Sequence, residues 1–417
     1  MRKEIIESIQ RLEELLAKVP DPVAKDVRKQ IEELRKLLLE QRAPRFALVG
    51  RRGSGKSSLI NAIFGEPVAE VGHEKAQTGR GKWWSYEREL GVIDILDTRG
   101  LQEGSSPTGE DEAVDATASI LNELKEKAPD TILFLVKAKE ADAAIDGDLA
   151  GLLTLSNKIK SIHGFRVPFI AIVTHCDELE PKNVRLHEPN SEDARDLEEK
   201  LARVKTIETL VDEKIREYPA LKDQLITVIG VSSYQSWRPD GTVRADERWR
   251  MEELLDFLLR ELPKEAQVAF ARLSRVQKLQ ESIADKLTHA VAVICSAIAF
   301  IPIPAVDIAP ITSLQVSLTS GIAYLSGREL TLKTTAEFLT AAGLNVGAGL
   351  AFREAARAII KLVAPGVGSV VSAGVAYAAT VGIGKAAAAY FIKGVGKDEI
   401  KGVFEREKAN ARVAGES

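Results

Sequence analysis

Apolar residues recur at helical spacing through the first 41 residues. One series runs from Ile5 to Leu16, and a second from Val27 to Leu38. Spacings of three and four residues predict amphipathic helices, and the Pro20-Asp-Pro22 segment between the series is typical of a break. Residues 1–43 are therefore predicted to form a helical hairpin.

The pattern changes between Arg45 and Leu262, where short β-rich runs alternate with helical stretches. The runs are FALVG, GVIDILD, TILFLVKA, VPFIAIVT and LITVIGVSS. This alternation favours an α/β domain over 44–262, with a doubly wound, mostly parallel sheet. We interpret the highly charged stretches 186–205 and 237–250 as solvated loops and helix faces.

The β pattern stops after Pro263, and residues 263–417 are predicted to form a hydrophobic, all-helical domain. Residues 290–306 and 362–384 carry no charge. The second run is long enough to span a bilayer, but its many small residues suit close helix packing in lipid or in a protein core. We favour a helical bundle with peripheral membrane contact; integral insertion is the alternative.

Composition narrows the class of protein. With 45% hydrophobic residues, 28% charged residues and a net charge of −4, the chain is globular in type and unlike a disordered or nucleic-acid-coating protein. Its two cysteines, Cys176 and Cys295, lie far apart and favour neither a disulfide framework nor a zinc site. The first residues lack the apolar core of a secretory signal, so we expect a cytoplasmic location, extending to the inner face of a membrane.

A phosphate-binding pattern follows the first β-rich run. Gly50-Arg-Arg-Gly-Ser-Gly-Lys-Ser57 matches G-x-x-x-x-G-K-[ST] between an apolar strand and a predicted helix, which disfavours a chance glycine-rich turn. Such a loop points backbone N–H groups at phosphate oxygens, with Lys56 on the β- and γ-phosphates and Ser57 on magnesium. The predicted nucleotide contacts here are Gly53, Ser54, Gly55, Lys56, Ser57 and Ser58.

A second pattern, Asp94-Ile-Leu-Asp97-Thr-Arg-Gly100, closes a later apolar strand. Asp97 is placed to hold Mg²⁺, and the Gly100 N–H to sense a γ-phosphate. Thr78, in Ala-Gln-Thr-Gly, is the candidate that closes over the metal. A buried capping aspartate and an ordinary loop threonine are the alternatives. We predict Mg²⁺ as cofactor, with Ser57, Thr78 and Asp97 as ligands.

The loop Thr174-His-Cys-Asp177 is expected to bind the base of the nucleotide whose phosphates the glycine-rich loop holds. The Asp177 carboxylate can accept from both N1–H and the exocyclic amine of guanine, which adenine cannot match. His175 stands where the pattern [NT]-K-x-D has lysine; it either stacks on the base or only caps the strand. The later Gly230-Val-Ser232-Ser233 fits a loop that donates N–H groups to the base carbonyl.

With these motifs, residues 44–262 resemble an Era-like P-loop GTPase domain. GRRGSGKSSLINAIFG with Thr78-Gly79 is particularly similar to the immunity-related GTPases and their bacterial relatives. The segment with Ile301-Pro-Ile-Pro304 and Asp307 resembles a hydrophobic helical domain of unknown function that often follows such domains. The resemblance implies binding of GTP and GDP, hydrolysis of GTP and action as a switch.

Two residues that usually assist GTP hydrolysis are absent from their expected positions in the sequence. Leu101 stands where the Ras-type template has a water-orienting glutamine, and Gln102 is one position late. Gly53 occupies the position where potassium-assisted relatives carry asparagine. We therefore expect slow intrinsic hydrolysis, accelerated by self-association or by a partner.

Three arginines are candidates to stabilise transition-state charge, in cis or across a homodimer of GTPase domains: Arg51, Arg52 and Arg99. With Lys56, Thr78 and Gly100 they complete the predicted catalytic set, although a solvent-facing role for each is the alternative. A ribosome- or RNA-associated GTPase and a non-hydrolysing GTP-binding scaffold are the rival functions. No basic patch interleaved with aromatic residues follows Pro263, so we expect no nucleic-acid partner.

Overall fold

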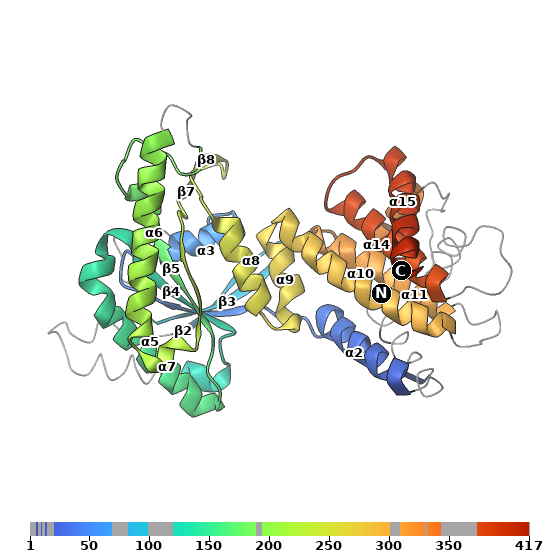
Figure 1. Cartoon of the computed structure of the whole chain (residues 1–417), viewed down its shortest axis with the longest axis horizontal. Coiled ribbons are helices and arrows are strands. Elements are labelled where there is room, and N and C mark those ends of the chain that lie inside the picture. Colours follow the sequence, from blue (N-terminus) through green and yellow to red (C-terminus); the bar gives the residue numbers. More distant parts are fainter. Residues whose placement is uncertain are drawn as a thin grey trace. The chain divides into compact units, whose positions relative to one another are not determined.

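The chain folds as two compact units (Figure 1). The computed structural model describes Ile6, Gln10, Glu13 and Glu14, and the ranges 21–68, 82–98, 120–188, 194–300, 309–329, 332–342 and 373–416. One unit comprises Ala43–Pro263, and the other joins Met1–Arg42 to Lys264–Ser417. The predicted N-terminal segment therefore belongs with the C-terminal helices and does not form a domain of its own.

A six-stranded sheet, in the order β2-β3-β1-β4-β5-β6, forms the centre of Ala43–Pro263 as far as the structure describes it. All neighbouring strands run parallel except β2, which is antiparallel to β3. The strands are β1 (Arg45–Val49), β2 (Lys82–Arg88), β3 (Gly91–Asp97), β4 (Thr131–Lys137), β5 (Phe169–Thr174) and β6 (Leu225–Gly230). The predicted doubly wound, mostly parallel P-loop sheet is confirmed.

Burial explains which strands the hydrophobic pattern predicted. β4 and β5 are covered on both faces, so they read as continuous apolar runs. β2 lies at the sheet edge, with Trp83 8% exposed and Trp84 42% exposed. Its mixed sequence therefore gave no apolar run. The polar hairpin of β7 (Gln235–Trp237) and β8 (Val243–Asp246) was not predicted either.

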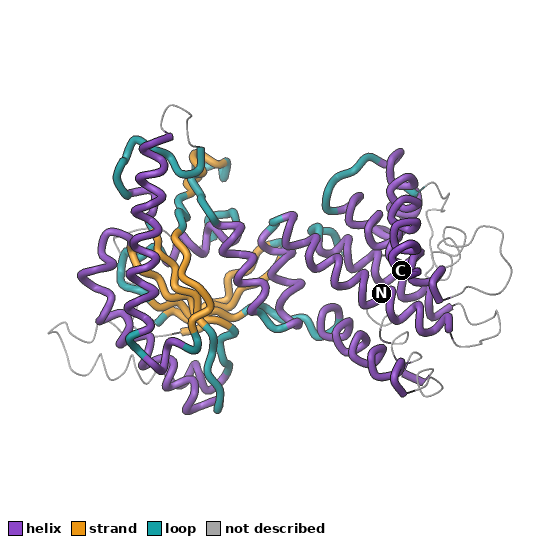
Figure 2. Tube along the Cα trace, viewed as in Figure 1, coloured by secondary structure: helices purple, strands orange, loops and turns teal. Residues whose placement is uncertain are grey.

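Helices cover both faces of this sheet (Figure 2). α5 (Ala141–His163) and α6 (Ala194–Arg216) pack on one face, together with the helical residues 120–126. α3 (Lys56–Phe64) and α8 (Met251–Glu261) lie on the other (Figure 1). The shorter helices are η2 (Ala138–Glu140), η3 (Cys176–Glu178) and α7 (Pro219–Lys222). Loops after parallel strands collect at the carboxyl edge of such a sheet, where ligands bind.

The second unit is all-helical in its described part, as predicted. It contains α2 (Asp21–Leu38), α9 (Lys264–Ser274), α10 (Gln277–Phe300), α11 (Ala309–Leu325), α12 (Leu332–Ala341), α14 (Ala373–Phe391) and α15 (Lys397–Glu416). α2 packs against α9 and α10 through its apolar stripe, which includes Val27, Ile31 and Leu34. The first predicted hairpin helix lies almost wholly outside the described residues.

Small residues let the helices of this unit approach closely. A Cβ on Gly384 of α14 would lie 2.2 Å from Thr288 Oγ1 of α10, and one on Gly382 would lie 3.0 Å from the Phe404 ring of α15. The charge-free run 290–306 ends in undescribed residues, 301–306, and the run 362–384 begins in undescribed residues, 362–372.

Among the described helices, α10 alone has a segment long and apolar enough to cross a membrane, Gln277–Ala299, whose most apolar window of 18 residues has a mean hydropathy of 1.4. Since 61% of its most apolar window is buried within the fold, a core helix accounts for it equally well.

Candidate nucleotide site

The glycine loop joins β1 to α3 and is shaped by its glycines. A Cβ on Gly50 would lie 2.6 Å from Ser54 Oγ and 2.8 Å from the Leu135 carbonyl, so no side chain fits there. Gly55 is the residue before α3 and has a φ of 87°, a conformation that glycine adopts without strain. No side chain caps the α3 N-terminus, which leaves its N–H groups open to an anion.

Polar groups line this loop. The Lys56 ammonium donates to the carbonyls of Gly50 and Arg51, the latter at 2.8 Å, and so lies over the loop. Ser54 Oγ is buried and has no hydrogen-bond partner among the described residues. Ser57 and the following Ser58 are half-buried in the first turn of α3. A phosphate group would give the serine a partner and would compete with the loop carbonyls for Lys56.

Asp97 lies where a magnesium ligand was predicted. It ends β3 and pairs in register with Leu48 of β1, the strand that leads into the glycine loop. Thr98 Oγ1 donates to the Leu48 carbonyl at 2.7 Å and ties the two strand ends together. A carboxylate from Asp97 and a hydroxyl from Ser57 are hard oxygen ligands that suit Mg²⁺.

The other predicted groups near the γ-phosphate lie outside the described residues: Thr78, Arg99, Gly100, Leu101 and Gln102. No three histidine, cysteine or acidic side chains gather at a metal-type site in the part of the chain that the structure describes. A magnesium site with one carboxylate needs no such cluster, because phosphate and water supply the remaining ligands.

The predicted base loop begins next to the glycine loop. Thr174 ends β5, and its Oγ1 donates to the Ser54 carbonyl at 2.9 Å. The His175 ring lies beside the backbone of Gly55 and makes a 2.9 Å hydrogen bond through Nδ1 with Thr174 Oγ1. Burial lowers the pKa of His175, so the neutral ring predominates near pH 7. His175 therefore lacks the positive charge of the lysine expected there.

The two predicted base loops lie side by side, although some 55 residues separate them. The Val231 N–H donates to the Val173 carbonyl at 2.8 Å, and the Cys176 N–H donates to the Val231 carbonyl at 3.3 Å. Buried Ser232 exchanges two backbone hydrogen bonds with Trp249, and the next residue, Ser233, is also buried. The half-buried Asp177 and the Ser232–Ser233 segment thus belong to one continuous surface.

Arg51 and Arg52 differ in their surroundings. Arg51 Nε donates to Asp148 Oδ1 of α5 at 2.8 Å, and burial of Asp148 raises the pKa of this carboxyl despite that partner. Arg52 is exposed. Arg51 thus pairs with a buried carboxylate while its own side chain stays 44% exposed, and Arg52 is likewise accessible from solvent.

The charged stretches interpreted as solvated contain side chains that support the site. Lys200 and Glu208 of α6 are buried, and Arg250 bonds to Glu208 at 2.7 Å. The solvated interpretation is wrong for Lys200, whereas the Arg250 side chain is half-buried, with 27% of its surface exposed. A sequence signal existed for the helix: Lys200, Val204 and Glu208 recur every four residues on the buried stripe of α6.

Gly230 is expected not to tolerate a side chain. A Cβ there would lie 2.6 Å from Val204 Cγ1 and 3.1 Å from Cys176 Sγ, and Val204 is buried and β-branched. Gly230→Ala should lower the free energy of unfolding by about 1–3 kcal/mol, measured by urea denaturation. Val204→Ala removes the clashing methyl, so the double variant should lose less than the sum of the two single variants. Strict additivity would show that this contact is not the cause.

Comparison with known proteins agrees with this geometry. Residues 45–172 match a family model described as 50S ribosome-binding GTPase. The chain is 34% identical over 120 residues to the GTPase Der of Halalkalibacterium halodurans, and 32% identical over 112 residues to that of Bartonella quintana. These spans cover 28% and 27% of this chain, and 25% and 22% of the two relatives. The chain thus spans about a quarter of the length of the curated relatives it matches.

Part of this chain also aligns with solved structures. A variant of Era from Aquifex aeolicus bound to GDP and aluminium fluoride has 19% identity and a TM-score of 0.32, covering 59% of this chain and 65% of that one. Toc33 from Arabidopsis thaliana, as a dimerization-deficient mutant, has 19% identity and a TM-score of 0.30, covering 54% and 88% respectively. The finer resemblance to immunity-related GTPases stays a prediction.

Proposed function

We propose that this chain, whose Ala43–Pro263 unit has the P-loop GTPase fold, binds GTP, hydrolyses it to GDP and phosphate, and acts as a nucleotide-dependent switch. One observation carries the proposal. The glycine loop, the Thr174–Asp177 loop and the Gly230–Ser233 loop meet at the carboxyl edge of the sheet and are bonded to one another. This arrangement provides a phosphate site and a base site within one surface.

Mg²⁺ would be held by Ser57 and Asp97, with Thr78 as the proposed third ligand. The metal would neutralise charge on the β- and γ-phosphates. The Lys56 ammonium supplies a second positive charge from the loop. The switch itself would lie in Thr78 and Gly100, which the γ-phosphate orders and hydrolysis releases.

Hydrolysis is proposed to need a group from outside the site. Leu101 cannot orient water, and Arg51 is bonded to buried Asp148. Arg51 and Arg52 are both exposed, and with Arg99 they are the arginines that we propose to reach a neighbouring GTPase domain. An arginine supplied across such an interface stabilises charge on the transferring phosphoryl group and can accelerate hydrolysis by orders of magnitude.

Turnover per molecule is therefore expected to rise with protein concentration. Phosphate release should be measured with GTP and with ATP, in Mg²⁺, from nanomolar to high micromolar protein. GTP should be the preferred substrate. At least one of Arg51→Ala, Arg52→Ala and Arg99→Ala should lower turnover about tenfold or more while leaving GTP affinity within a few-fold.

Two results would contradict parts of this account. Flat activity per molecule, with all three variants hydrolysing normally, would remove self-stimulation and favour a separate activator. Tight GTP binding with no turnover at any concentration would favour the non-hydrolysing scaffold.

A ribosome-associated GTPase is a second candidate, favoured by the description of the family model that matches residues 45–172. Co-sedimentation with ribosomes in GDP and in a non-hydrolysable GTP analogue would separate the two. Nucleotide-dependent co-sedimentation would support the ribosome role, and none would favour the self-associating switch.

The helical unit is proposed to contact a partner or a membrane surface peripherally, from the cytoplasmic side. The apolar segment of α10 supports this proposal without requiring insertion. Flotation with vesicles, with and without high-salt washing, distinguishes peripheral contact from integral insertion.

A further inference from the structure

α6 carries two buried charged residues on its sheet-facing stripe. Lys200 is 0% exposed and Glu208 is 6% exposed, and Val204 lies between them on the same face. Burying a charge is unfavourable unless hydrogen bonds compensate for the lost water. Each of these side chains should therefore have hydrogen-bond partners that compensate for the loss of hydration.

Lys200 finds its partners in the segment that follows the predicted base loop. Its ammonium donates to the carbonyls of Asp177 at 2.7 Å, Pro181 at 3.3 Å and Val184 at 2.8 Å. An ammonium has three donors, so these three carbonyls satisfy it. One buried side chain thus ties together a segment of eight residues that begins at Asp177.

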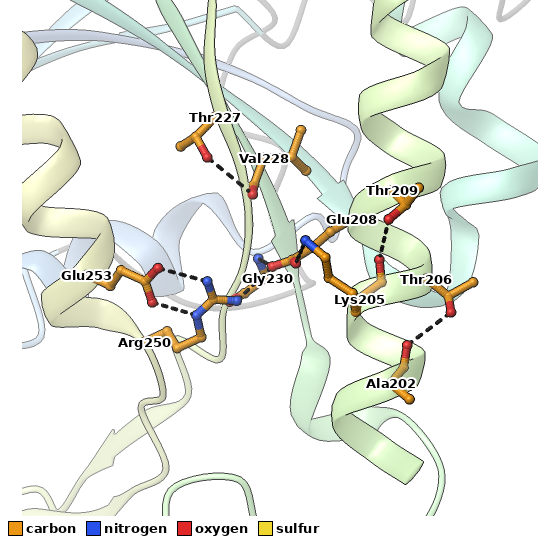
Figure 3. Close-up of polar contacts among 10 residues, drawn as sticks. All are labelled: Ala202, Lys205, Thr206, Glu208, Thr209, Thr227, Val228, Gly230, Arg250 and Glu253. Carbon is orange, nitrogen blue, oxygen red and sulfur yellow. Dashed lines mark hydrogen bonds and ion pairs between the residues drawn. The ribbon is translucent and has the colours of Figure 1, made fainter. Parts of the chain in front are cut away.

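Glu208 bonds to the start of the second predicted base loop, Gly230–Ser233 (Figure 3). Its carboxylate accepts from the Gly230 N–H at 2.7 Å and from Arg250 Nη1 at 2.7 Å. Arg250 also donates to Glu253 through Nε at 2.7 Å and Nη2 at 2.9 Å, which links α6 to the first turn of α8. Glu208 therefore holds the end of β6, directly before Val231 and the two serines.

We propose that α6 sets the position of the guanine-reading loops, with Lys200 and Glu208 as positioning residues for base selectivity. Two turns of one helix separate the two side chains, so the helix fixes the spacing between the two loops it holds. This inference rests on the proposed function, because it assumes that Asp177 reads the base. Hydrogen bonds weaken steeply as distance and angle change, so a small shift of Asp177 should cost base contacts.

The phosphate contacts depend on a different segment, the glycine loop after β1. Loss of Lys200 should therefore change recognition of the base more than recognition of the phosphates. A purely structural role for Lys200 would instead lower the folded fraction and leave the ratio of affinities for two nucleotides unchanged.

The test compares GTP with ITP, which lacks the exocyclic amine that Asp177 is proposed to bind. Dissociation constants are measured for the full chain, as wild type and as Lys200→Met. The wild type should prefer GTP by about tenfold. Lys200→Met should reduce this preference to within about threefold. Arg203→Met, which removes an exposed positive charge one turn away on α6, should retain it.

Glu208→Gln provides an independent variant, because glutamine can still accept from Gly230 but loses the ion pair with Arg250. It should reduce the preference to an intermediate value, and it keeps the proposal testable if Lys200→Met does not fold. An unchanged GTP/ITP ratio in a folded Lys200→Met, or in Glu208→Gln if only that variant folds, would overturn the positioning role alone. A wild type without any preference for GTP over ITP would overturn guanine recognition itself, and this inference with it.

Discussion

Replacement of Lys56 by alanine should abolish tight GTP binding, with a loss of affinity of at least about 100-fold, or about 3 kcal/mol. Lys56 is the cation that the glycine loop presents to the β- and γ-phosphates, and hydrogen bonds to charged groups are the strong ones. In the structure its ammonium already lies over the loop, on the carbonyls of Gly50 and Arg51. Isothermal titration calorimetry with GTP and Mg²⁺ measures the effect directly.

The control for this variant is Lys160→Ala, which removes an exposed lysine from the last turn of α5. It should leave GTP affinity unchanged. Thermal unfolding of both variants verifies that the fold is intact. Wild-type affinity in folded Lys56→Ala would remove the central claim that this loop holds the phosphates.

Replacement of Asp177 by asparagine should weaken GTP binding at least tenfold, on the order of 1–3 kcal/mol. The carboxylate can accept from both N1–H and the exocyclic amine of guanine, whereas an amide offers one acceptor and one donor group. The same change should strengthen binding of XTP, because xanthine carries a carbonyl where guanine carries the amine. Competition against a fluorescent nucleotide gives both affinities.

The gain in XTP affinity is the internal control, because an unfolded variant would bind neither nucleotide. Unchanged GTP affinity would show that Asp177 does not read the base. Equal binding of ATP and GTP by the wild type would show that His175, in place of the expected lysine, costs the site its specificity.

The local motifs could be predicted because their physics is local. The order of residues from Gly50 to Ser57 contains both the glycines that the turn needs and the start of α3. Asp97 and Asp177 each follow an apolar run directly, and parallel strands bring such positions to one edge. The class of the sheet followed from the same alternation. Strand β2 did not, because an edge strand with Trp84 half in solvent gives no apolar run.

Other features depend on contacts between segments far apart in the chain. The backbone hydrogen bond from Cys176 to Val231 joins the two predicted base loops into one surface. No spacing in the sequence predicts this contact. Likewise, Arg51 bonds to Asp148, which lies 97 residues later in the chain, and no spacing in the sequence predicts that contact.

By itself, the sequence determined the glycine loop, the sheet that carries it and the helical character of α2 and of the described segments after Pro263, since each follows from neighbouring residues and their periodicity. Only the tertiary structure decided that the N-terminal helix α2 joins the C-terminal helices, and that Lys200 and Glu208 are buried. The physical reason is that a charged residue in a sequence is interpreted as solvent-exposed unless the groups that hydrogen-bond to it are known. For Lys200 those partners are backbone carbonyls, which no residue type reveals and which only the folded chain brings within hydrogen-bonding distance.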